Sequence, residues 1–292
     1  MKTLCWTCFV LSTLLSTNPA WAAGPETALP IRLSNSRPEI PFKLYGGYVI
    51  LVEGRIGSLD NLRFIIDTGA TATFIDRRIG KKLGLVSTSG SISHFNKITR
   101  AQWVAIPELQ VGPLRAIGLS VPMVDLSYVA DLASHVDAII GLDVLRTSSF
   151  TIDYRSKRIS FGAVSSPGFS VPILSSSPYL VVQIQVRGYP VRLVVDSSAN
   201  RLVLYEDRID CRVAGIRVVG ETLVRSVGGG IRAKKIWLPA TLGGTNLDGE
   251  GLLLGSSTDA RLSAADGYMG LTTLRAWLVA FDFQHNTLSW QK

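Results

Sequence analysis

The chain has 292 residues, of which 47% are hydrophobic and 18% are charged. This balance excludes a disordered chain, and the length suits one large domain or two lobes of ordinary size. Lys and Arg number 30 against 22 for Asp and Glu, which gives a formal net charge of +8. The basic residues are scattered and are not interleaved with aromatic residues, so the sequence indicates no nucleic-acid partner.

The first 22 residues have the pattern of a secretory signal peptide. Lys2 provides a positive charge, residues 4–15 form a short apolar run, and residues 20–22 (Ala-Trp-Ala) fit a cleavage site. We therefore expect cleavage after Ala22, export to the periplasm or the medium, and a linker at residues 23–39. The apolar run is too short to span a bilayer and no later run reaches that length, so we expect no stable membrane anchor.

Cysteine and histidine are too few and too scattered for several common chemistries. Cys5 and Cys8 fall within the signal peptide, which leaves Cys211 without an intramolecular disulfide partner. Cys211 is either a catalytic thiol or, as we prefer, a half-buried structural residue. The three histidines are scattered and no metal-binding motif occurs, so we expect no metal and no cofactor.

The sequence after the signal peptide repeats itself. Residues 137–161 align without a gap with residues 266–290, and seven positions are identical. We therefore predict two homologous lobes, at residues 40–162 and 171–292, with a linker at residues 163–170.

The pattern within each lobe is mostly that of β-strands. In the first lobe we predict strands at residues 48–52 and 64–66, short helices at 76–83 and 142–146, and a closing hairpin with its turn at 155–158. The counterparts in the second lobe are strands at 179–186 and 193–195, helices at 206–213 and 271–275, and a turn at 284–287. Strands and helices do not alternate regularly, which argues against a doubly wound sheet.

The same repeat aligns Asp67 with Asp196, and each follows a short apolar strand directly. Burying a carboxylate is costly unless it is paired or hydrogen-bonded, so such a position is unusual for a structural residue. A pseudo-twofold relation between the lobes would bring both carboxyl groups to one point. Two carboxyl groups about 3 Å apart share one proton, so one can act as a base toward water while the other donates to a carbonyl oxygen.

At these residues the sequence resembles the aspartic peptidases of the pepsin and retropepsin type. The resemblance lies in the motif FIIDTGAT at residues 64–71 and in the later Ile139, Ile140 and Gly141. It implies an all-β fold of two β-barrel lobes, each with a ψ-shaped loop in which the later apolar pair and Gly141 pack under the catalytic loop. Its bacterial retropepsin-like form implies function nearer neutral than strongly acidic pH.

The resemblance also implies roles for the residues that support the two aspartates. Thr68 and Ser197 would bond the opposite loop, and the Gly69 amide, next to Ala70, would orient a carboxyl group. The second lobe keeps Met269 and Gly270 for ψ-loop packing. Its departure is Ser198, which stands where the family has glycine and would be strained if its φ were positive.

Two segments are candidates for flaps over the site, residues 87–100 and 226–233. The candidate tip residues are His94, Phe95, Gly228, Gly229 and Gly230. Glycine suits a hairpin that must move, because it lifts the restriction on φ.

The sequence thus predicts an exported, monomeric aspartic endopeptidase that hydrolyses peptide or protein substrates. Two alternatives remain. Ser198 favours a pseudopeptidase that binds peptides or a protein partner without cleaving them. A third arrangement would pair the Asp67 residues of two separate chains.

Overall fold

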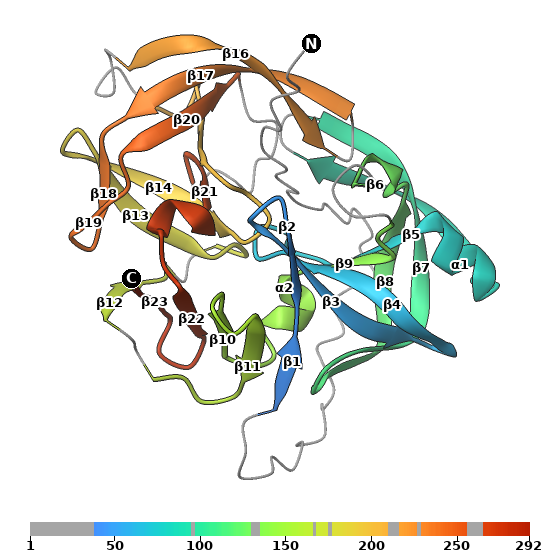
Figure 1. The fold of residues 1–292 in the computed structure, drawn as a ribbon. Coiled ribbons are helices and arrows are strands. Elements are labelled where there is room, and N and C mark those ends of the chain that lie inside the picture. The colour runs from blue at the N-terminus through green and yellow to red at the C-terminus, as the bar shows by residue number, and fades with distance from the viewer. Residues whose placement is uncertain are drawn as a thin grey trace, which may run out of the picture.

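The structure is a computed structural model that describes residues 38–94, 97–129, 135–165, 168–174, 177–209, 216–226, 229–255 and 265–292. Regular structure in these residues is mostly β-strand, arranged in three sheets, and the prediction of an all-β fold is confirmed. In Figure 1 the first sheet lies to the right, the second to the upper left, and the third below them. The predicted signal peptide and Cys211 lie outside the described residues.

The first sheet, which we call lobe 1, has the strand order β2-β3-β4-β9-β5-β8-β7-β6. Strand β9 lies between β4 and β5, parallel to the first and antiparallel to the second, which forms a ψ-shaped crossing. The bounds are β2 (Lys43–Tyr45), β3 (Val49–Ile56), β4 (Leu59–Ile66), β5 (Phe74–Asp76), β6 (Ser87–His94), β7 (Lys97–Val111), β8 (Leu114–Val124) and β9 (Ala138–Ile140).

The second sheet, which we call lobe 2, has the order β16-β17-β20-β15-β21-β14-β13-β18-β19. Strand β21 lies between β14 and β15 with the same directions as β9 between β4 and β5. The bounds are β13 (Val181–Val186), β14 (Tyr189–Asp196), β15 (Leu202–Tyr205), β16 (Arg217–Ser226), β17 (Gly229–Leu238), β18 (Ala240–Leu242), β19 (Thr245–Asn246), β20 (Gly249–Leu254) and β21 (Gly267–Gly270).

The third sheet joins the two lobes in the order β1-β11-β10-β22-β23-β12. At its centre β10 pairs with β22, and Phe150 lies opposite Phe281 while Ile152 lies opposite Val279. In the sequence repeat Phe150 corresponds to Val279 and Ile152 to Phe281, so the register is symmetric and a pseudo-twofold axis passes between the two strands. The bounds are β1 (Glu39–Pro41), β10 (Phe150–Asp153), β11 (Arg158–Phe161), β12 (Phe169–Pro172), β22 (Leu278–Asp282) and β23 (Thr287–Gln291).

The largest buried apolar cluster runs through all three sheets. It includes Phe64 in lobe 1, Leu193 in lobe 2, and Phe150 and Phe281 in the joining sheet. The rings of Phe150 and Phe281 stack with centroids 4.8 Å apart. Burial of such side chains contributes about 1.5–3 kcal/mol each, so the lobes are held by a shared core.

The sequence pattern accounts for the strands that approach the site. In β13 the buried residues alternate with two exposed glutamines, as expected of a strand with one wet face. The residues directly before Asp67 and Asp196, at 64–66 in β4 and 193–195 in β14, are apolar at every position and buried, as expected of strands covered on both faces.

Three short helices lie close to predicted positions: α1 (Arg77–Lys82), α2 (Leu142–Leu145) and the 3-10 helix η4 (Leu271–Leu274). A further 3-10 helix, η1 (Ser127–Val129), was not predicted. Asp76 caps α1, because its Oδ1 accepts the Arg78 amide at 2.8 Å. The described part of the predicted helix at 206–213 is not helical, and its remainder lies outside the described residues.

Part of the predicted linker at residues 163–170 is a strand. Phe169 and Ser170 begin β12, which pairs with β23. The reason is aromatic packing, since the rings of Phe169 and Trp290 stack with centroids 5.7 Å apart.

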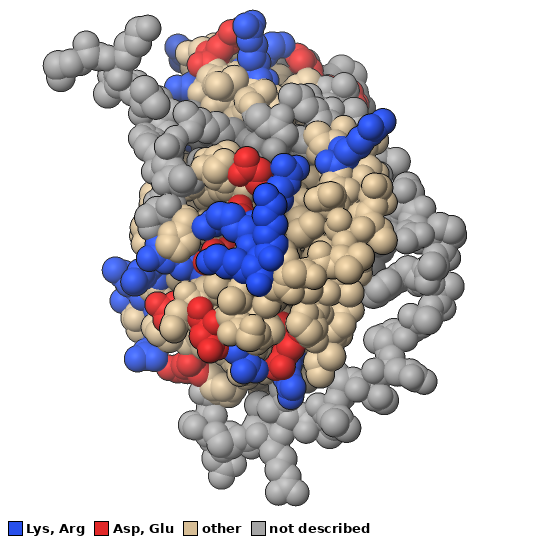
Figure 2. Space-filling view, turned by 90° about the vertical axis from the view of Figure 1, so that its right-hand side faces the viewer, with Lys and Arg blue, Asp and Glu red and all other residues tan. Residues whose placement is uncertain are grey.

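The surface of lobe 1 carries a basic group of side chains. Arg77, Arg78, Lys81 and Lys82 are all exposed on α1. Figure 2 views the side of the molecule on which α1 lies and shows Lys and Arg gathered at its centre, with acidic side chains beside them. None of the helices in the described residues is long and apolar enough to cross a membrane.

Candidate active site

Asp67 directly follows the last residue of β4, and the crossing strand β9 holds its loop. Strands β4 and β9 are paired up to Ile66 and Ile140. Beyond this pair the Asp67 amide donates to the Ile140 carbonyl at 3.0 Å, and the Leu142 amide donates to the Ala70 carbonyl at 2.8 Å. The loop that carries Asp67 is therefore fixed at both ends.

Asp196 is placed in the same way in lobe 2. It ends β14 and pairs with Gly270 of β21, where Met269 pairs with Val195. The Gly270 amide donates to the Arg201 carbonyl at 2.9 Å. The ψ-crossing thus positions one aspartate in each lobe.

Gly141 and Gly270 are required by close approach of the backbone. A Cβ atom at Gly141 would lie 2.4 Å from backbone atoms of Ala72, and one at Gly270 would lie 2.4 Å from the Ala199 carbonyl oxygen. Any side chain at either position would push the crossing strand away from the catalytic loop.

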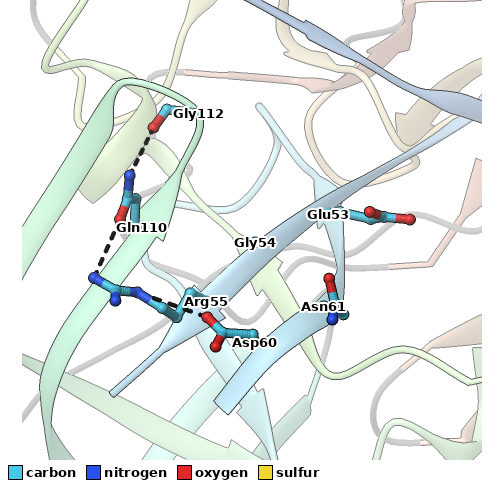
Figure 3. A pocket seen from close by; sticks show the side chains of 7 residues that line it. All are labelled: Glu53, Gly54, Arg55, Asp60, Asn61, Gln110 and Gly112. Atoms are coloured by element: carbon cyan, nitrogen blue, oxygen red, sulfur yellow. Dashed lines mark hydrogen bonds and ion pairs between the residues drawn. The ribbon is translucent and has the colours of Figure 1, made fainter. Parts of the chain in front are cut away.

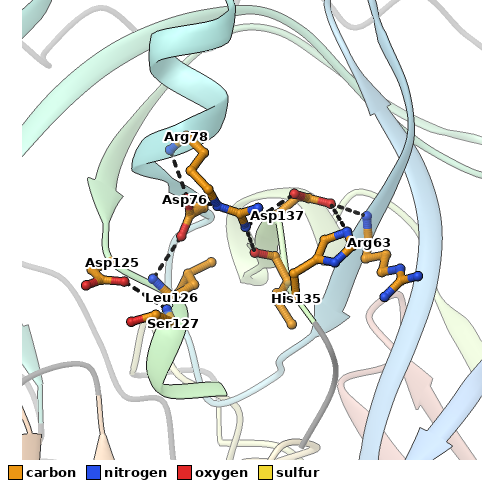
Figure 4. Close-up of polar contacts among 9 residues, drawn as sticks. Arg63, Asp76, Arg78, Asp125, Leu126, Ser127, His135 and Asp137 are labelled. Atoms are coloured by element: carbon orange, nitrogen blue, oxygen red, sulfur yellow. Dashed lines mark hydrogen bonds and ion pairs between the residues drawn. The ribbon is translucent and has the colours of Figure 1, made fainter. Parts of the chain in front are cut away.

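A second pair of equivalent aspartates anchors the start of each crossing strand. The Arg63 amide donates to Asp137 Oδ2 at 2.9 Å, and the Arg192 amide donates to Asp266 Oδ2 at 2.8 Å. Figure 4 shows Asp137 between the Arg63 amide and the guanidinium of Arg78, whose Nη2 lies 3.6 Å from Asp137 Oδ1. The repeated aspartates therefore have the same structural task in both lobes.

Thr68 and Ser197 connect the two loops by reciprocal hydrogen bonds. The Thr68 amide donates to Ser197 Oγ at 3.0 Å and the Ser197 amide donates to Thr68 Oγ1 at 2.9 Å. The Thr68 hydroxyl donates to the Val195 carbonyl at 2.9 Å and the Ser197 hydroxyl to the Ile66 carbonyl at 2.8 Å. Thr68 and Ser197 are separated by 129 residues, which is also the offset of the sequence repeat.

This arrangement brings the carboxyl groups of Asp67 and Asp196 together within one chain. Both residues are 0% exposed. The Gly69 amide donates to Asp67 Oδ1 at 2.9 Å, and the Ser198 amide donates to Asp196 Oδ1 at 2.7 Å. Both Oδ2 atoms are buried and accept no hydrogen bond from a donor in the described residues. A proton shared between the two carboxyl groups would satisfy these oxygens.

Burial is the main influence on the charge of this pair. It raises the pKa of Asp67, and the neighbouring charge of Asp196 raises it further. Burial also raises the pKa of Asp196, to about 7, against the lowering effect of hydrogen bonds from Ser198. The pair therefore retains one proton near neutral pH and titrates as a unit.

Ser198 fits beside the dyad without the strain that a positive φ would bring. Neither Gly69 nor Ser198 is among the residues with positive φ. The Ser198 side chain is 1% exposed, and its hydroxyl donates to Asp196 Oδ1 at 2.8 Å. The serine is therefore a further polar group in contact with the dyad.

These features lead to a comparison with known families. Residues 52–144 match a family model described as aspartyl protease. For this segment of lobe 1 the match supports an aspartic peptidase of the retropepsin type. The match supports a protease function, and it spans the Asp67 loop together with the β9–α2 crossing. The search of curated proteins found no match.

Three residues near the Asp67 loop, which are Thr73, Asp143 and Tyr128, had no functional interpretation from the sequence. The Thr73 hydroxyl and amide donate to the Asp143 carboxylate at 2.7 and 2.8 Å, and the Gly141 amide donates to Thr73 Oγ1 at 3.2 Å. Asp143 thus ties the segment after the catalytic loop to the ψ-crossing. The available signal was the first-lobe motif IIGLD itself, in which Asp143 follows Gly141 by two residues.

Tyr128 is the third of these residues. Burial raises the pKa of its phenol, and the charges of Asp67 and Asp125 raise it further. The phenol therefore stays neutral near the dyad. No spacing in the sequence relates η1 to the catalytic loop, so only the folded chain shows this proximity.

The flap candidates are placed in two hairpins. Strands β6 and β7 form the first, in which His94 pairs with Lys97. Strands β16 and β17 form the second, in which Gly229 and Gly230 pair with Ser226 and Arg225. Phe95 and Gly228 lie outside the described residues.

Other polar features of the described residues are separate from the dyad. Figure 3 shows a surface pocket between β3, β4 and β7 that is lined by Glu53, Arg55, Asp60, Asn61 and Gln110, with Arg55 close to Gln110 and Asp60. Nowhere in the described part of the chain do three or more His, Cys, Asp or Glu side chains form a group that could hold a metal ion.

Proposed function

We propose that the protein is an exported aspartic endopeptidase in which each lobe supplies one carboxyl group. The observation that carries this proposal is the juxtaposition of Asp67 and Asp196, whose loops are joined by Thr68 and Ser197. Two buried carboxyl groups with raised pKa values are suited to hold one proton between them.

The chemistry is general acid–base hydrolysis of a peptide bond. The ionised carboxylate takes a proton from water as the water oxygen bonds to the substrate carbonyl carbon. The protonated carboxyl group gives its proton to the carbonyl oxygen, so that a neutral tetrahedral diol forms. Proton transfer to the amide nitrogen then allows the C–N bond to break, and the dyad returns to its single-proton state.

The substrate is an extended segment of a peptide or protein. The β6–β7 and β16–β17 hairpins belong one to each lobe, and we propose that they cover the substrate as flaps. Since Thr68 and Ser197 of the same chain already hydrogen-bond each other, one chain contains a complete pair of catalytic loops. We therefore propose an active monomer and disfavour the pairing of Asp67 residues from two chains.

The test uses the purified protein recovered after export. It is incubated with a denatured protein as substrate, and the fragments are identified by mass spectrometry. Cleavage at internal bonds that is blocked by a statine-type transition-state mimic supports the proposal. Loss of activity with a chelator or with a serine- or thiol-directed reagent would show that the carboxylate mechanism is wrong.

A pseudopeptidase is the second candidate, and the Ser198 side chain favours it. Its hydroxyl lies against Asp196, and the dyad is 0% exposed. In that case the chain would bind extended peptides or the transition-state mimic without producing fragments. Binding without turnover at every pH between about 3 and 8 would favour this alternative.

A further inference from the structure

The Ser198 hydroxyl makes the two halves of the dyad unequal. Asp196 Oδ1 accepts both the Ser198 amide at 2.7 Å and the Ser198 hydroxyl at 2.8 Å. At the equivalent place in lobe 1, Asp67 Oδ1 accepts the Gly69 amide at 2.9 Å, and glycine has no hydroxyl to add. A hydrogen bond donated to a carboxylate stabilises its charged form.

Lobe 1 has no room for a matching side chain. A Cβ atom at Gly69 would lie 2.6 Å from both Cγ and Oδ2 of Asp196. The asymmetry is therefore built into the packing, because only the lobe 2 loop can place a hydroxyl at the dyad.

The Ser198 hydroxyl also lowers the pKa of Asp67, but by less than burial and the charge of Asp196 raise it. A serine hydroxyl has one hydrogen and two lone pairs. Its hydrogen is directed to Asp196 Oδ1, so the hydroxyl stabilises negative charge directly on Asp196. The preference for an ionised Asp196 beside a neutral Asp67 rests on the two hydrogen bonds that Ser198 donates to Asp196 Oδ1, against one from Gly69 to Asp67 Oδ1.

A further titratable group near the pair in the described residues is Tyr128, whose pKa is raised by burial and by the charge of Asp67. Its raised pKa keeps the phenol neutral, so it adds no charge that would reverse the preference. Asp125 acts on Tyr128 and is exposed, so its effect on the dyad is screened.

We propose that Ser198 is a positioning residue that holds the negative charge of the dyad on Asp196 and leaves the proton on Asp67. In catalysis Asp196 would then take the proton from water, and Asp67 would donate its proton to the substrate carbonyl oxygen. This division of roles rests on the proposed function, whereas the location of the proton does not.

The experiment measures each carboxyl group alone, without substrate. Full-length Asp67→Asn protein leaves Asp196 as the single titrating member, and Asp196→Asn leaves Asp67. Each is prepared with Ser198 intact and with Ser198→Ala, and carboxyl-labelled aspartate is titrated by carbon-13 NMR. In the Asp67→Asn background we expect Ser198→Ala to raise the pKa of Asp196 by about one to two pH units.

The Asp196→Asn background is the matched control. There Ser198→Ala should raise the pKa of Asp67 by clearly less than it raises that of Asp196, because the hydroxyl donates to Asp196 Oδ1. An unchanged Asp196 pKa in the first background, or an Asp67 pKa raised by as much in the second, overturns the proposal. Ser198→Gly serves as the replacement if Ser198→Ala does not fold, and Ser198→Thr should restore the pKa of Asp196 because it retains the hydroxyl.

Kinetics separate this inference from the proposed function. In the intact dyad the acid limb of the kcat/KM profile reports formation of the singly ionised pair. Ser198→Ala should move that limb to higher pH by about one to two units, and by more than it moves the alkaline limb. If the NMR shifts occur and no variant turns over substrate, the proton assignment stands and the endopeptidase proposal fails.

Discussion

Thr68 and Ser197 each donate through the amide to the hydroxyl of the other, and each hydroxyl donates to a carbonyl of the opposite loop. All four groups are buried, and the exchange is nearly symmetric. Four hydrogen bonds are therefore concentrated at the point where the lobes bring Asp67 and Asp196 together. The position of the dyad depends on this exchange as much as on the strands that lead to it.

The first prediction concerns the dyad itself. Asp67→Asn and Asp196→Asn should each reduce peptidase activity by several orders of magnitude, measured as kcat/KM on a denatured protein or peptide. The double variant should be little worse than either, because residues that act as one unit are not additive. Asp60→Asn is the matched control, since its carboxylate is exposed on the surface of lobe 1. Full activity in Asp196→Asn would rule out a dyad within one chain.

The second prediction concerns stability and pH. Folding raises the pKa of Asp196 to about 7, above the value of about 3.9 for an unfolded chain. The contribution of Asp196 to the free energy of unfolding is therefore fully present below about pH 4, and it is lost as the pH rises through about 7. Asp196→Asn should unfold at a temperature roughly 5–10 °C higher than the parent at pH 8, and at nearly the same temperature at pH 3.5. The unfolding temperatures are measured by circular dichroism. An equal difference between variant and parent at both pH values would contradict the buried-charge explanation.

The third prediction concerns the exchange between the loops. Thr68→Val keeps the shape of the side chain and leaves the Ser197 amide and the Val195 carbonyl without their bonds to Thr68. We expect a loss of about 2–4 kcal/mol in the free energy of unfolding, measured with denaturant. Thr68→Ser retains the hydroxyl and should lose less than half as much. If Thr68→Val leaves the free energy of unfolding unchanged, the hydrogen bonds between the loops contribute little to stability.

The fourth prediction concerns the ψ-crossing. Gly141→Ala would place a Cβ atom 2.4 Å from the backbone of Ala72. The strand must shift to accommodate it, at a cost of about 1–3 kcal/mol or more, and the dyad geometry should suffer as well. At Gly249 an added Cβ would have the Leu247 carbonyl oxygen at 3.9 Å as its nearest neighbour. Gly249→Ala should therefore leave both activity and stability close to those of the parent.

The fifth prediction concerns export. Material recovered from the periplasm of a bacterial host should begin at Ala23, as shown by N-terminal sequencing, because residues 20–22 fit a cleavage site. Replacing Ala22 with a bulky residue should slow cleavage and leave the mature fold unaltered. Recovery of the parent in the cytoplasmic fraction with Met1 retained would contradict the signal-peptide prediction.

The sequence by itself determined the repeated plan of the fold. Apolar residues at every position before Asp67 and Asp196 indicated strands buried on both faces, and both strands form. The repeat also aligns Asp153 with Asp282, and each accepts backbone amides in the turn that follows it. Such features follow from local periodicity and from groups a few residues apart, so they can be read along the chain.

Only the tertiary structure decided how the two halves of the site differ. The repeat aligns Gly69 with Ser198, yet a side chain at Gly69 would strike Asp196 while that of Ser198 hydrogen-bonds it. Tyr128 likewise comes near Asp67 through the fold and through no spacing in the sequence. The physical reason is that burial, close approach and the direction of a hydrogen bond depend on distances between groups far apart in the chain. Residue order leaves those distances unspecified until both lobes pack on the joining sheet.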